Sequence, residues 1–458
     1  MSFSPERLRE ALDGILREAA IVPAGYCVGL SGGLDSTVLV AALADPAVSP
    51  PLAMRAVHVD HGLHQDAERW SARAATLAAH FGVPFEIVRV DARPAPGESP
   101  EAAARVARYG AFAERLRCGE VLLSAHHADD QLETVLLQWL RGGGLRAVAG
   151  MRPVTPFAGG WLARPLLAFT RAELLAWAES RGLAWSQDPA NADTRFDRNY
   201  LRLEVLPKLR MRWPAAARTV GRVAAQAVEA LEIEAEVVAS DLANVAEGST
   251  LVLARLGMLA PGRQRLVLRA WLRTRGLEPP SAATLEALRH DALVAGANRI
   301  PETRWPGAVV RRYRGRLHAA VASHDDRPWQ PGSMRPGMAF DLGQAGRLEL
   351  VAATGHGLSR ERLPADLEVV PRPAGASFRP AGGTHRRELR KWLQERGVLP
   401  WQRERLPCLV AGGEIVAIGD LAYGAGLAAA PGEPSWRIAW HGRPLLTETE
   451  AIASRTRA

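Results

Sequence analysis

Short apolar runs alternate with helical segments over the first 145 residues, and this alternation constrains the fold more than any other feature of the sequence. The runs predict strands at 26–30, 55–60, 85–90 and 120–124, and the segments that follow them predict helices around 36–43, 66–81, 100–117 and 130–141. Strands separated by helices form βαβ units. The sequence therefore predicts an α/β fold with a doubly wound parallel sheet.

Changes in composition beyond this sheet predict three domains, 1–215, 216–325 and 337–445. The second should be mostly helical, with a long helix at 215–242, a basic amphipathic helix at 263–275 and a hairpin that turns at Arg314–Gly315. A Pro- and Gly-rich linker at 325–336 precedes the third, which mixes short strands with one clear helix and is expected to be a small α+β domain.

The charge of the chain indicates a polyanionic partner. Lysine and arginine total 57 against 49 acidic residues, a formal charge of +8, and all the basic residues except Lys208 and Lys391 are arginine. A GC-rich genome explains the preference for arginine as well as any functional reason does. The net positive charge favours nucleic acid as the partner.

The same composition predicts a cytoplasmic protein with no membrane contact. No apolar run approaches the ~20 residues that a membrane span needs, and the first 20 residues are too charged for a secretion signal. Cys27, Cys118 and Cys408 are far apart and form no disulfide framework, which indicates a reducing compartment.

A Gly-Gly loop joins the first predicted strand to the first predicted helix of the sheet, where an open α/β sheet binds its ligand. The glycines allow close approach of the backbone, the serines can donate hydrogen bonds, and the helix N-terminus favours anions. The loop lacks the lysine of a Walker A site and the spacing of a dinucleotide fingerprint. The candidate ATP-binding residues are Ser31, Gly32, Gly33, Leu34, Asp35 and Ser36.

A second polar cluster, residues 124–134, follows the fourth predicted strand. Asp130 and Glu133 are three positions apart near the start of the predicted helix, on a different face from its apolar stripe, so they point toward the Gly-Gly loop. Acids that merely cap the helix are the alternative. His126 and His127 could be zinc ligands, but no cysteine or third histidine lies at metal-binding spacing.

These motifs resemble a known family. The loop at 31–36 resembles the pyrophosphate loop of the N-type ATP pyrophosphatases (the PP-loop superfamily), and residues 126–134 resemble the motif that marks the tRNA(Ile)-lysidine synthase family within it. Further similar segments are 57–63, 101–109, 141–151 and 188–207, although Ala190 stands where the family has serine and Val205 where it has leucine. The resemblance covers 1–215 strongly, and 263–281 and 378–419 more weakly.

The resemblance implies a ligase reaction. The O2 atom of the wobble cytidine of an isoleucine tRNA would attack the α-phosphate of ATP, pyrophosphate would leave, and the ε-amine of free lysine would then displace AMP from C2. Asp35 would lie beside the phosphates with Mg²⁺, because a carboxylate alone would repel them.

Lysine is a poor nucleophile at neutral pH, so the second step needs help. Its ε-amine has a pKa of about 10.4, and forming the neutral amine at pH 7 costs about 4.6 kcal/mol. Asp130 and Glu133 could bind the ammonium ion and accept its proton, with His126 as a further candidate. Arg105, Arg198 and Arg202 could stabilise phosphate charge or position the tRNA, or could be surface arginines.

Two basic segments predict contact with the RNA backbone. The segment 299–316 has six arginines and one acid, and 377–406 has seven arginines and a lysine against three glutamates. In the second, an apolar stripe of Leu389, Trp392 and Leu393 faces the core. The expected tRNA-binding residues on the exposed side are Arg386, Arg387, Arg390 and Lys391.

Three other functions compete with lysidine formation. A PP-loop tRNA thiolase is the main alternative, although sulfur relay normally uses paired cysteines or an iron–sulfur cluster. A small-molecule amidating synthetase would not explain the basic C-terminal half, and a non-catalytic RNA-binding module would not need both motifs. The sequence leaves the oligomeric state open, including a homodimer.

Overall fold

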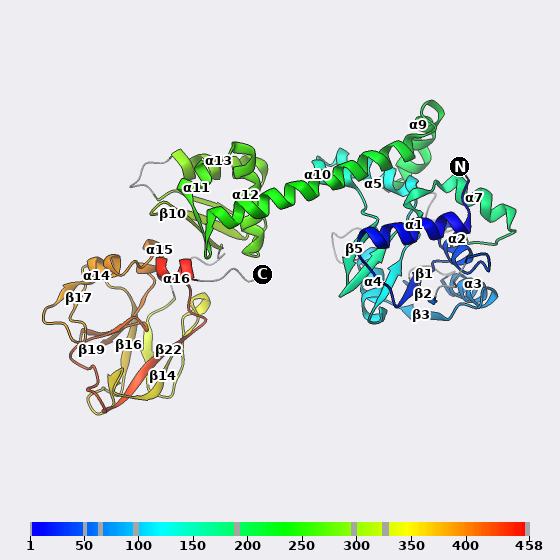
Figure 1. The fold of residues 1–458 in the computed structure, drawn as a ribbon. Coiled ribbons are helices and arrows are strands. Elements are labelled where there is room, and N and C mark those ends of the chain that lie inside the picture. Colours follow the sequence, from blue (N-terminus) through cyan, green and yellow to red (C-terminus); the bar gives the residue numbers. More distant parts are fainter. Residues whose placement is uncertain are drawn as a thin grey trace. The chain divides into compact units, whose positions relative to one another are not determined.

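The computed structural model describes residues 2–48, 53–62, 67–94, 100–186, 193–294, 300–322 and 329–453. The chain forms two compact units, Met1–Glu234 and Ala235–Ala458, which we call the N-terminal and C-terminal units (Figure 1). The boundary falls inside one long helix, α10 (Ala216–Val245). The division into domains 1–215, 216–325 and 337–445 is finer than this and stays a prediction.

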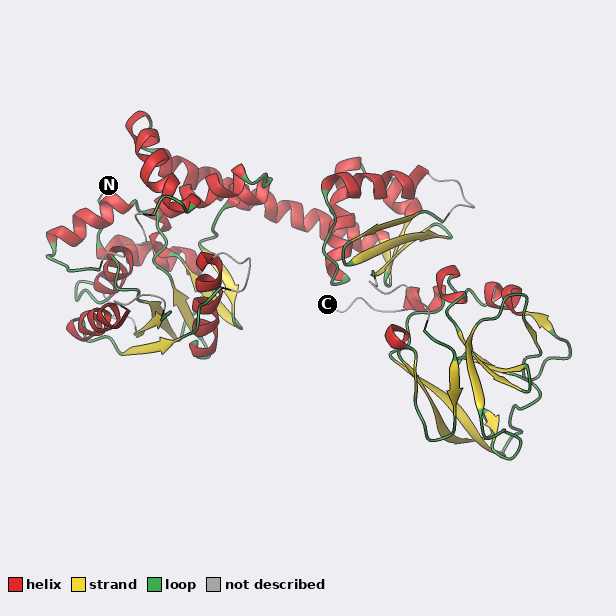
Figure 2. Cartoon of the chain, turned by 180° about the vertical axis from the view of Figure 1, so that it is seen from behind, coloured by secondary structure: helices red, strands yellow, loops and turns green. Residues whose placement is uncertain are grey.

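The N-terminal unit contains the predicted parallel sheet, with helices on both sides (Figure 2). Its strand order is β3-β2-β1-β4-β6-β5, and only β5 is antiparallel to its neighbour. The strands are β1 (Gly25–Gly29), β2 (Met54–Asp60), β3 (Phe85–Arg89), β4 (Glu120–Leu123), β5 (Val154–Phe157) and β6 (Gly160–Ala163). The strand order reverses at β1, which places a ligand crevice at the carboxyl ends of β1 and β4.

The helices of this unit follow the apolar spacing of the sequence. α1 starts at a Ser4 cap and buries Leu8, Leu12 and Leu16, whereas α2 is apolar on nearly every side because it is enclosed within the core. The other helices are α3 (Ala67–His80), α4 (Pro100–Arg115), α5 (Ala128–Leu140), α6 (Leu145–Ala149), α7 (Arg171–Ser180), α8 (Asp197–Tyr200) and α9 (Leu206–Arg212), after α1 (Pro5–Glu18) and α2 (Leu34–Leu43). The predicted fold class is confirmed.

The first part of the C-terminal unit packs three helices and the end of α10 with a five-stranded sheet of order β7-β8-β11-β10-β9. The predicted hairpin is present, and Arg314 and Gly315 have φ of 46° and 73°, as a two-residue type I′ turn requires. The elements are α11 (Leu253–Gly257), α12 (Pro261–Thr274), α13 (Ala282–Val294), β7 (Ala246–Glu247), β8 (Thr250–Val252), β9 (Glu302–Trp305), β10 (Ala308–Tyr313) and β11 (Arg316–Val321).

The last part of the chain is built on two antiparallel sheets, β12-β16-β19-β20-β21 and β13-β14-β22-β15, and a two-stranded ribbon, β17-β18. The predicted helix is α14 (Leu389–Glu395), whose apolar stripe is buried as expected. The remaining elements are β12 (Gly332–Met334), β13 (Phe340–Asp341), β14 (Arg347–Thr354), β15 (Leu358–Ser359), β16 (Leu367–Pro371), β17 (Ser377–Phe378), β18 (Arg387–Glu388), α15 (Pro400–Arg403), β19 (Pro407–Ala411), β20 (Glu414–Ile418), β21 (Ala422–Tyr423), β22 (Pro434–His441) and α16 (Glu448–Ala453).

The helices within the described ranges are also informative about membranes. None of them is both long enough and apolar enough to cross a bilayer.

Candidate active site

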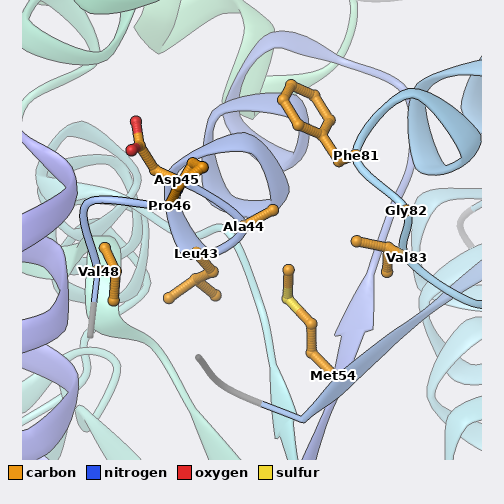
Figure 3. Close-up of a pocket in the computed structure, with 9 residues that line it drawn as sticks. All are labelled: Leu43, Ala44, Asp45, Pro46, Val48, Met54, Phe81, Gly82 and Val83. Carbon is orange, nitrogen blue, oxygen red and sulfur yellow. The ribbon is translucent and has the colours of Figure 1, made fainter. Parts of the chain in front are cut away.

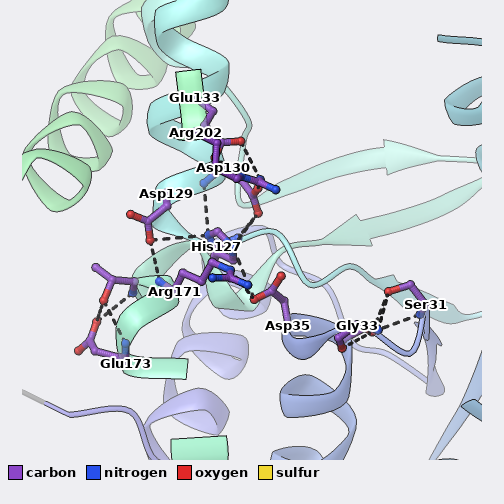
Figure 4. Close-up of polar contacts among 12 residues, drawn as sticks. Ser31, Gly33, Asp35, His127, Asp129, Asp130, Glu133, Arg171, Glu173 and Arg202 are labelled. Carbon is purple, nitrogen blue, oxygen red and sulfur yellow. Dashed lines mark hydrogen bonds and ion pairs between the residues drawn. The ribbon is translucent and has the colours of Figure 1, made fainter. Parts of the chain in front are cut away.

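The Gly-Gly loop (residues 31–36) follows the carboxyl end of β1, and hydrogen bonds of its own serines stabilise it. The hydroxyls of Ser31 and Ser36 lie 3.0 Å apart, and Ser36 also accepts a hydrogen bond from the Ser31 N–H and donates one to the Gly33 carbonyl (Figure 4). Gly32 has a φ of 80°, a conformation that favours glycine. α2 begins after Gly33 without any side-chain cap, so its first N–H groups are available to an anion.

Asp35 lies in the first turn of α2 and faces α5. Its Oδ1 atom is 3.6 Å from His127 Nε2 and 4.0 Å from Arg171 Nε. This oxygen is buried and has no hydrogen bond to any residue that the structure describes, although the carboxyl group as a whole is partly exposed. Burial raises the pKa of Asp35, but His127, Arg171 and Arg202 outweigh burial and lower the pKa below its ordinary value. Asp35 is therefore an ionised carboxylate with an unused oxygen at the loop.

His127 fixes the start of α5 and connects it to Asp35. Its Nδ1 atom accepts a hydrogen bond from the Asp130 N–H, while Asp130 Oδ2 accepts one from the His127 N–H, which forms a reciprocal cap. Because Nδ1 accepts, the Nε2 atom is the ring proton donor, and it lies between the carboxylates of Asp35 and Asp130 at 3.6 and 3.4 Å. This cap also explains why α5 starts at Ala128, two residues before the predicted start.

Asp130 and Glu133 are buried near the start of α5, and two arginines bind both of them. Glu133 is almost completely buried, and its oxygens accept hydrogen bonds from Arg198 Nε at 3.0 Å and Arg202 Nε at 2.8 Å. Arg202 Nη2 also bonds Asp130 Oδ1 at 3.1 Å (Figure 4). The predicted residues Asp130, Glu133, Arg198 and Arg202 thus form one cluster, and the two arginines compensate the buried acids.

His126 points to a different part of the same edge from His127. Its Nδ1 atom lies 2.8 Å from the Ser124 hydroxyl. Burial lowers the pKa of His126 well below its ordinary value, and nearby arginines act in the same direction, so the imidazole is neutral at pH 7. These arginines are Arg164, Arg105, Arg108 and Arg198.

Arg105 is exposed on α4, where its guanidinium lies 5.1 Å from the Tyr109 ring centre. It thus belongs to the cationic surroundings of His126, separate from the acids. Several predicted motif positions lie outside the described residues, namely Leu63, Asp188, Pro189, Ala190, Asn191 and Arg299.

Two contributors to the site were missed by sequence reasoning. His127 was considered only as a zinc ligand, and the cap that orients it depends on where α5 begins. Arg171 starts α7, and its backbone N–H donates to Asp129 Oδ2 at 2.6 Å while its side chain approaches Asp35. Only the fold brings Arg171 to α5, so no local sequence signal could identify it.

The site has one good candidate ligand for a cation. Within the described ranges, no group of three or more histidine, cysteine or acidic side chains could hold a metal ion. Mg²⁺, however, often binds through one or two carboxylates together with substrate phosphates and water. The unbonded Oδ1 of Asp35, beside the phosphate loop, fits that mode.

A separate cavity of about 240 Å³ lies near the amino ends of the strands, opposite the candidate active site (Figure 3). It is formed where α2 ends, where β2 begins at Met54, and where the chain enters β3 after Phe81. The Gly-Gly loop, Asp130 and Glu133 are at the carboxyl ends of the strands. This cavity is therefore distinct from the candidate active site.

Comparisons with known proteins agree with this geometry. The PP-loop domain matches residues 8–209, the TilS substrate binding domain 251–318 and the TilS substrate C-terminal domain 367–440. The tRNA(Ile)-lysidine synthase of Alkalilimnicola ehrlichii is 42% identical over 438 residues, covering 94% of this chain and 96% of that protein. The chain belongs to the tRNA(Ile)-lysidine synthase family.

Two further members of the tRNA(Ile)-lysidine synthase family illustrate how far the similarity extends. The protein of Methylococcus capsulatus is 40% identical over 86% of this chain and 91% of its own length. That of Pseudomonas aeruginosa is 39% identical over 91% of this chain and 93% of its own length. The similarity thus includes both units of the chain.

The predicted tRNA-binding residues lie within the family's C-terminal domain and are all exposed. Arg386 pairs with Glu414 at 2.7 Å, Arg387 pairs with Glu395, and Lys391 lies 3.6 Å from Glu388. Arg390 has no acidic partner among the described residues. Exposed pairs of this kind contribute little to stability and separate at small cost.

Proposed function

We propose that the chain ligates lysine to C2 of the wobble cytidine of an isoleucine tRNA through an adenylated tRNA intermediate, releasing AMP and pyrophosphate. One observation carries this proposal beyond family membership. The uncapped start of α2, the ionised Asp35 and the Asp130–Glu133 pair meet at one edge of one sheet. This arrangement supports an ATP phosphate site next to a site for an amine nucleophile.

In the first step, the loop 31–36 binds the phosphates of ATP. The N–H groups at the start of α2 donate hydrogen bonds to the phosphates, and Ser31 and Ser36 keep the loop in shape. Asp35 would hold Mg²⁺, which neutralises the charge that develops on the phosphates as pyrophosphate leaves. His127 and Arg171 keep the Asp35 carboxylate ionised and hold it on the side of α2 that faces α5.

In the second step, the acids of α5 bind the lysine ε-ammonium and take up its proton. Recovering the neutral amine costs about 4.6 kcal/mol at pH 7, so a carboxylate within reach lowers the barrier directly. Asp130 is better placed for this than Glu133, because Glu133 is 1% exposed and bonded to two arginines. We propose His126 as a further proton-transfer group.

The C-terminal unit supplies affinity for the tRNA. Arg386, Arg387, Arg390 and Lys391 would contact phosphates, because they are exposed and their ion pairs are weak. Arg105, Arg198 and Arg202 would position the anticodon loop or the reacting phosphate. We also propose a cytoplasmic location, where tRNA, ATP and lysine are available, and leave a homodimer as an alternative to a monomer.

Incubation with candidate tRNAs, ATP and labelled lysine, followed by nucleoside mass analysis, tests the proposal. The expected result is a cytidine that gains the mass of lysine minus water, only in a tRNA with cytidine at the wobble position. A nucleoside that gains sulfur instead would favour the thiolase alternative. An unmodified tRNA under all conditions would contradict the proposed function.

A further inference from the structure

Two arginines of the N-terminal unit are equally buried but differ in their partners. Arg55 and Arg164 are each 7% exposed. Arg55 donates from Nε and Nη2 to the two oxygens of Glu120, at 2.9 and 2.7 Å. Arg164 makes no ion pair with any acid in the described part of the chain. Its Nη1 atom donates to the Arg152 carbonyl at 2.7 Å and to the Thr155 hydroxyl at 3.4 Å, and its Nε atom is buried without a hydrogen bond to the residues that the structure describes.

Arg164 lies at the carboxyl edge of the sheet, beside the candidate active site. It directly follows β6, which runs parallel to β4 with Ala163 opposite Leu123. The Ser124 N–H donates to the Ala163 carbonyl at 3.0 Å, so Arg164 and His126 leave neighbouring strands at the same edge. The positive charge of Arg164 is also one of the influences on the His126 ring.

A buried guanidinium without an acid is costly, because the charge has left water without a counter-ion. Burial lowers the pKa of Arg164, and Arg105 adds to this, whereas Tyr109 opposes it. The pKa of Arg55, by contrast, is raised by its hydrogen bonds to Glu120. Arg164 is fixed by its Nη1 contacts, whereas its buried Nε atom makes no hydrogen bond to the described residues, so an anion that reaches Nε would supply both the missing acceptor and the missing counter-ion.

We propose that Arg164 binds the α-carboxylate of the free amino acid substrate through its Nε edge. This inference rests on the proposed function and names the group that recognises one end of lysine. The Nε and Nη2 atoms of a guanidinium match the two oxygens of a carboxylate, as Arg55 and Glu120 demonstrate in the same sheet.

A small carboxylate fits this position better than either phosphate source. A polynucleotide backbone runs over a protein surface, whereas Arg164 is 7% exposed. The ATP phosphates belong to the loop after β1, and β4 separates β1 from β6. Strands lie ~4.8 Å apart, so the ends of β1 and β6 are about 10 Å apart.

The charges around the crevice would also orient the amino acid. The guanidinium groups of Arg164 and Arg105 form a side that repels an ammonium ion and attracts a carboxylate, and the neutral His126 adds no charge to it. The carboxylates of Asp35 and Asp130 lie on the other side, toward α5, and would accept hydrogen bonds from an ammonium ion. Lysine would therefore bind with its carboxylate at Arg164 and its ε-amine toward α5.

The experiment compares lysine with 1,5-diaminopentane, which has the same amine chain but no carboxylate, as acceptors of the activated tRNA. The full-length wild-type chain is measured beside Arg164→Gln, Arg164→Lys and the control Arg146→Gln, which removes an exposed arginine. We expect Arg164→Gln to lower kcat/KM for lysine ~10- to 100-fold, mainly through KM, as for removal of a charge-assisted pair. The value for diaminopentane should stay within about twofold, and Arg164→Lys should recover part of the preference.

The ratio of the two acceptors is measured within one variant, so partial unfolding does not affect it. An unchanged ratio in Arg164→Gln would overturn the inference. So would weaker tRNA binding, or slower pyrophosphate release without lysine, since either would assign Arg164 to a phosphate. If the wild-type chain forms no lysine product at all, the proposed function itself fails and the inference fails with it.

Discussion

The amino ends and the carboxyl ends of the strands in the N-terminal sheet, which we call the amino edge and the carboxyl edge, differ in how their charged side chains are paired. At the amino edge, the guanidinium of Arg55 and the carboxylate of Glu120 hydrogen-bond each other. At the carboxyl edge, Asp35 Oδ1 and Arg164 Nε are buried without hydrogen bonds. The amino edge is complete without a ligand, whereas the carboxyl edge leaves polar atoms that a substrate would satisfy.

This difference suggests that side chains at the amino edge contribute to stability and that side chains at the carboxyl edge contribute to activity. Buried polar atoms without partners are costly, and proteins retain them mainly where function requires them. Substitutions at the carboxyl edge should therefore reduce activity more than stability. Substitutions at the amino edge should do the reverse.

The largest effect is expected for Asp35→Ala. Removing the carboxylate beside the phosphate loop should slow pyrophosphate release by about 10³-fold or more, because charge stabilisation is among the largest contributions to catalysis. The fold should persist, since Asp35 makes no hydrogen bond from its buried oxygen. Release at close to the wild-type rate would show that Asp35 does not act on ATP.

A large effect on stability, with little effect on activity, is expected for Glu120→Gln at the amino edge. Breaking a buried ion pair should lower the free energy of unfolding by up to about 3 kcal/mol, because Arg55 loses its closer acid and keeps only Glu86, at 3.6 Å. Arg55 holds the pKa of Glu120 below its ordinary value, so this stabilisation is present at neutral pH and is lost as pH falls through the lowered pKa. Denaturant unfolding at several pH values measures both the loss of stability and its pH dependence. The folded fraction of Glu120→Gln should keep wild-type activity.

An intermediate effect is expected for Asp130→Asn and Glu133→Gln. Asp130→Asn should slow the lysine step by about 10²-fold, the usual contribution of a general base, Glu133→Gln should slow it less, and both should slow adenylation less than the lysine step. Single-turnover measurements can follow the tRNA adenylate and lysidine separately. Equal slowing of both steps would remove the specific role in binding lysine.

The smallest effect is expected far from the sheet, for combined alanine substitution of Arg386, Arg387, Arg390 and Lys391. Removing one phosphate contact should lower the slope of log affinity against log salt by roughly 0.7 to 0.9, and removing all four should lower it by about 3. The value of about 3 is therefore an upper limit, because three of the four residues pair with glutamates and must leave them to contact phosphate.

Turnover of this variant should recover substantially at saturating tRNA, because the chemistry belongs to the other unit. An unchanged salt slope would mean that α14 does not contact the RNA backbone.

The sequence identified the parts of the site that local spacing encodes. Asp35 follows from its position between a strand and a helix, and Asp130 and Glu133 follow from their helical spacing. Arg164 and Arg171 could not be found in this way, because their roles depend on β6 and α7 reaching the same edge as β4. The choice between His126 and His127 depends on which residue caps α5, and a shift of one residue exchanges their directions.

The sequence predicted the longer elements of the fold but not the shortest strands. Strands and helices of the parallel sheet have clear periodicity, whereas β5 and β6 have four residues each and were not predicted. Pro156 in β5 argues against a strand, but β5 is at the edge of the sheet, where proline is tolerated. Strands of two residues in the C-terminal unit are too short to carry any periodic signal.

Parallel measurement of Asp35→Ala and Glu120→Gln tests the division between the two edges most directly. Both variants and the wild-type chain would be unfolded by denaturant and assayed for tRNA-dependent pyrophosphate release under the same conditions. We expect Asp35→Ala to be about as stable as wild type but inactive, and Glu120→Gln to be less stable but active while folded. An active Asp35→Ala, or a folded but inactive Glu120→Gln, would contradict the assignment of the chemistry to the carboxyl edge.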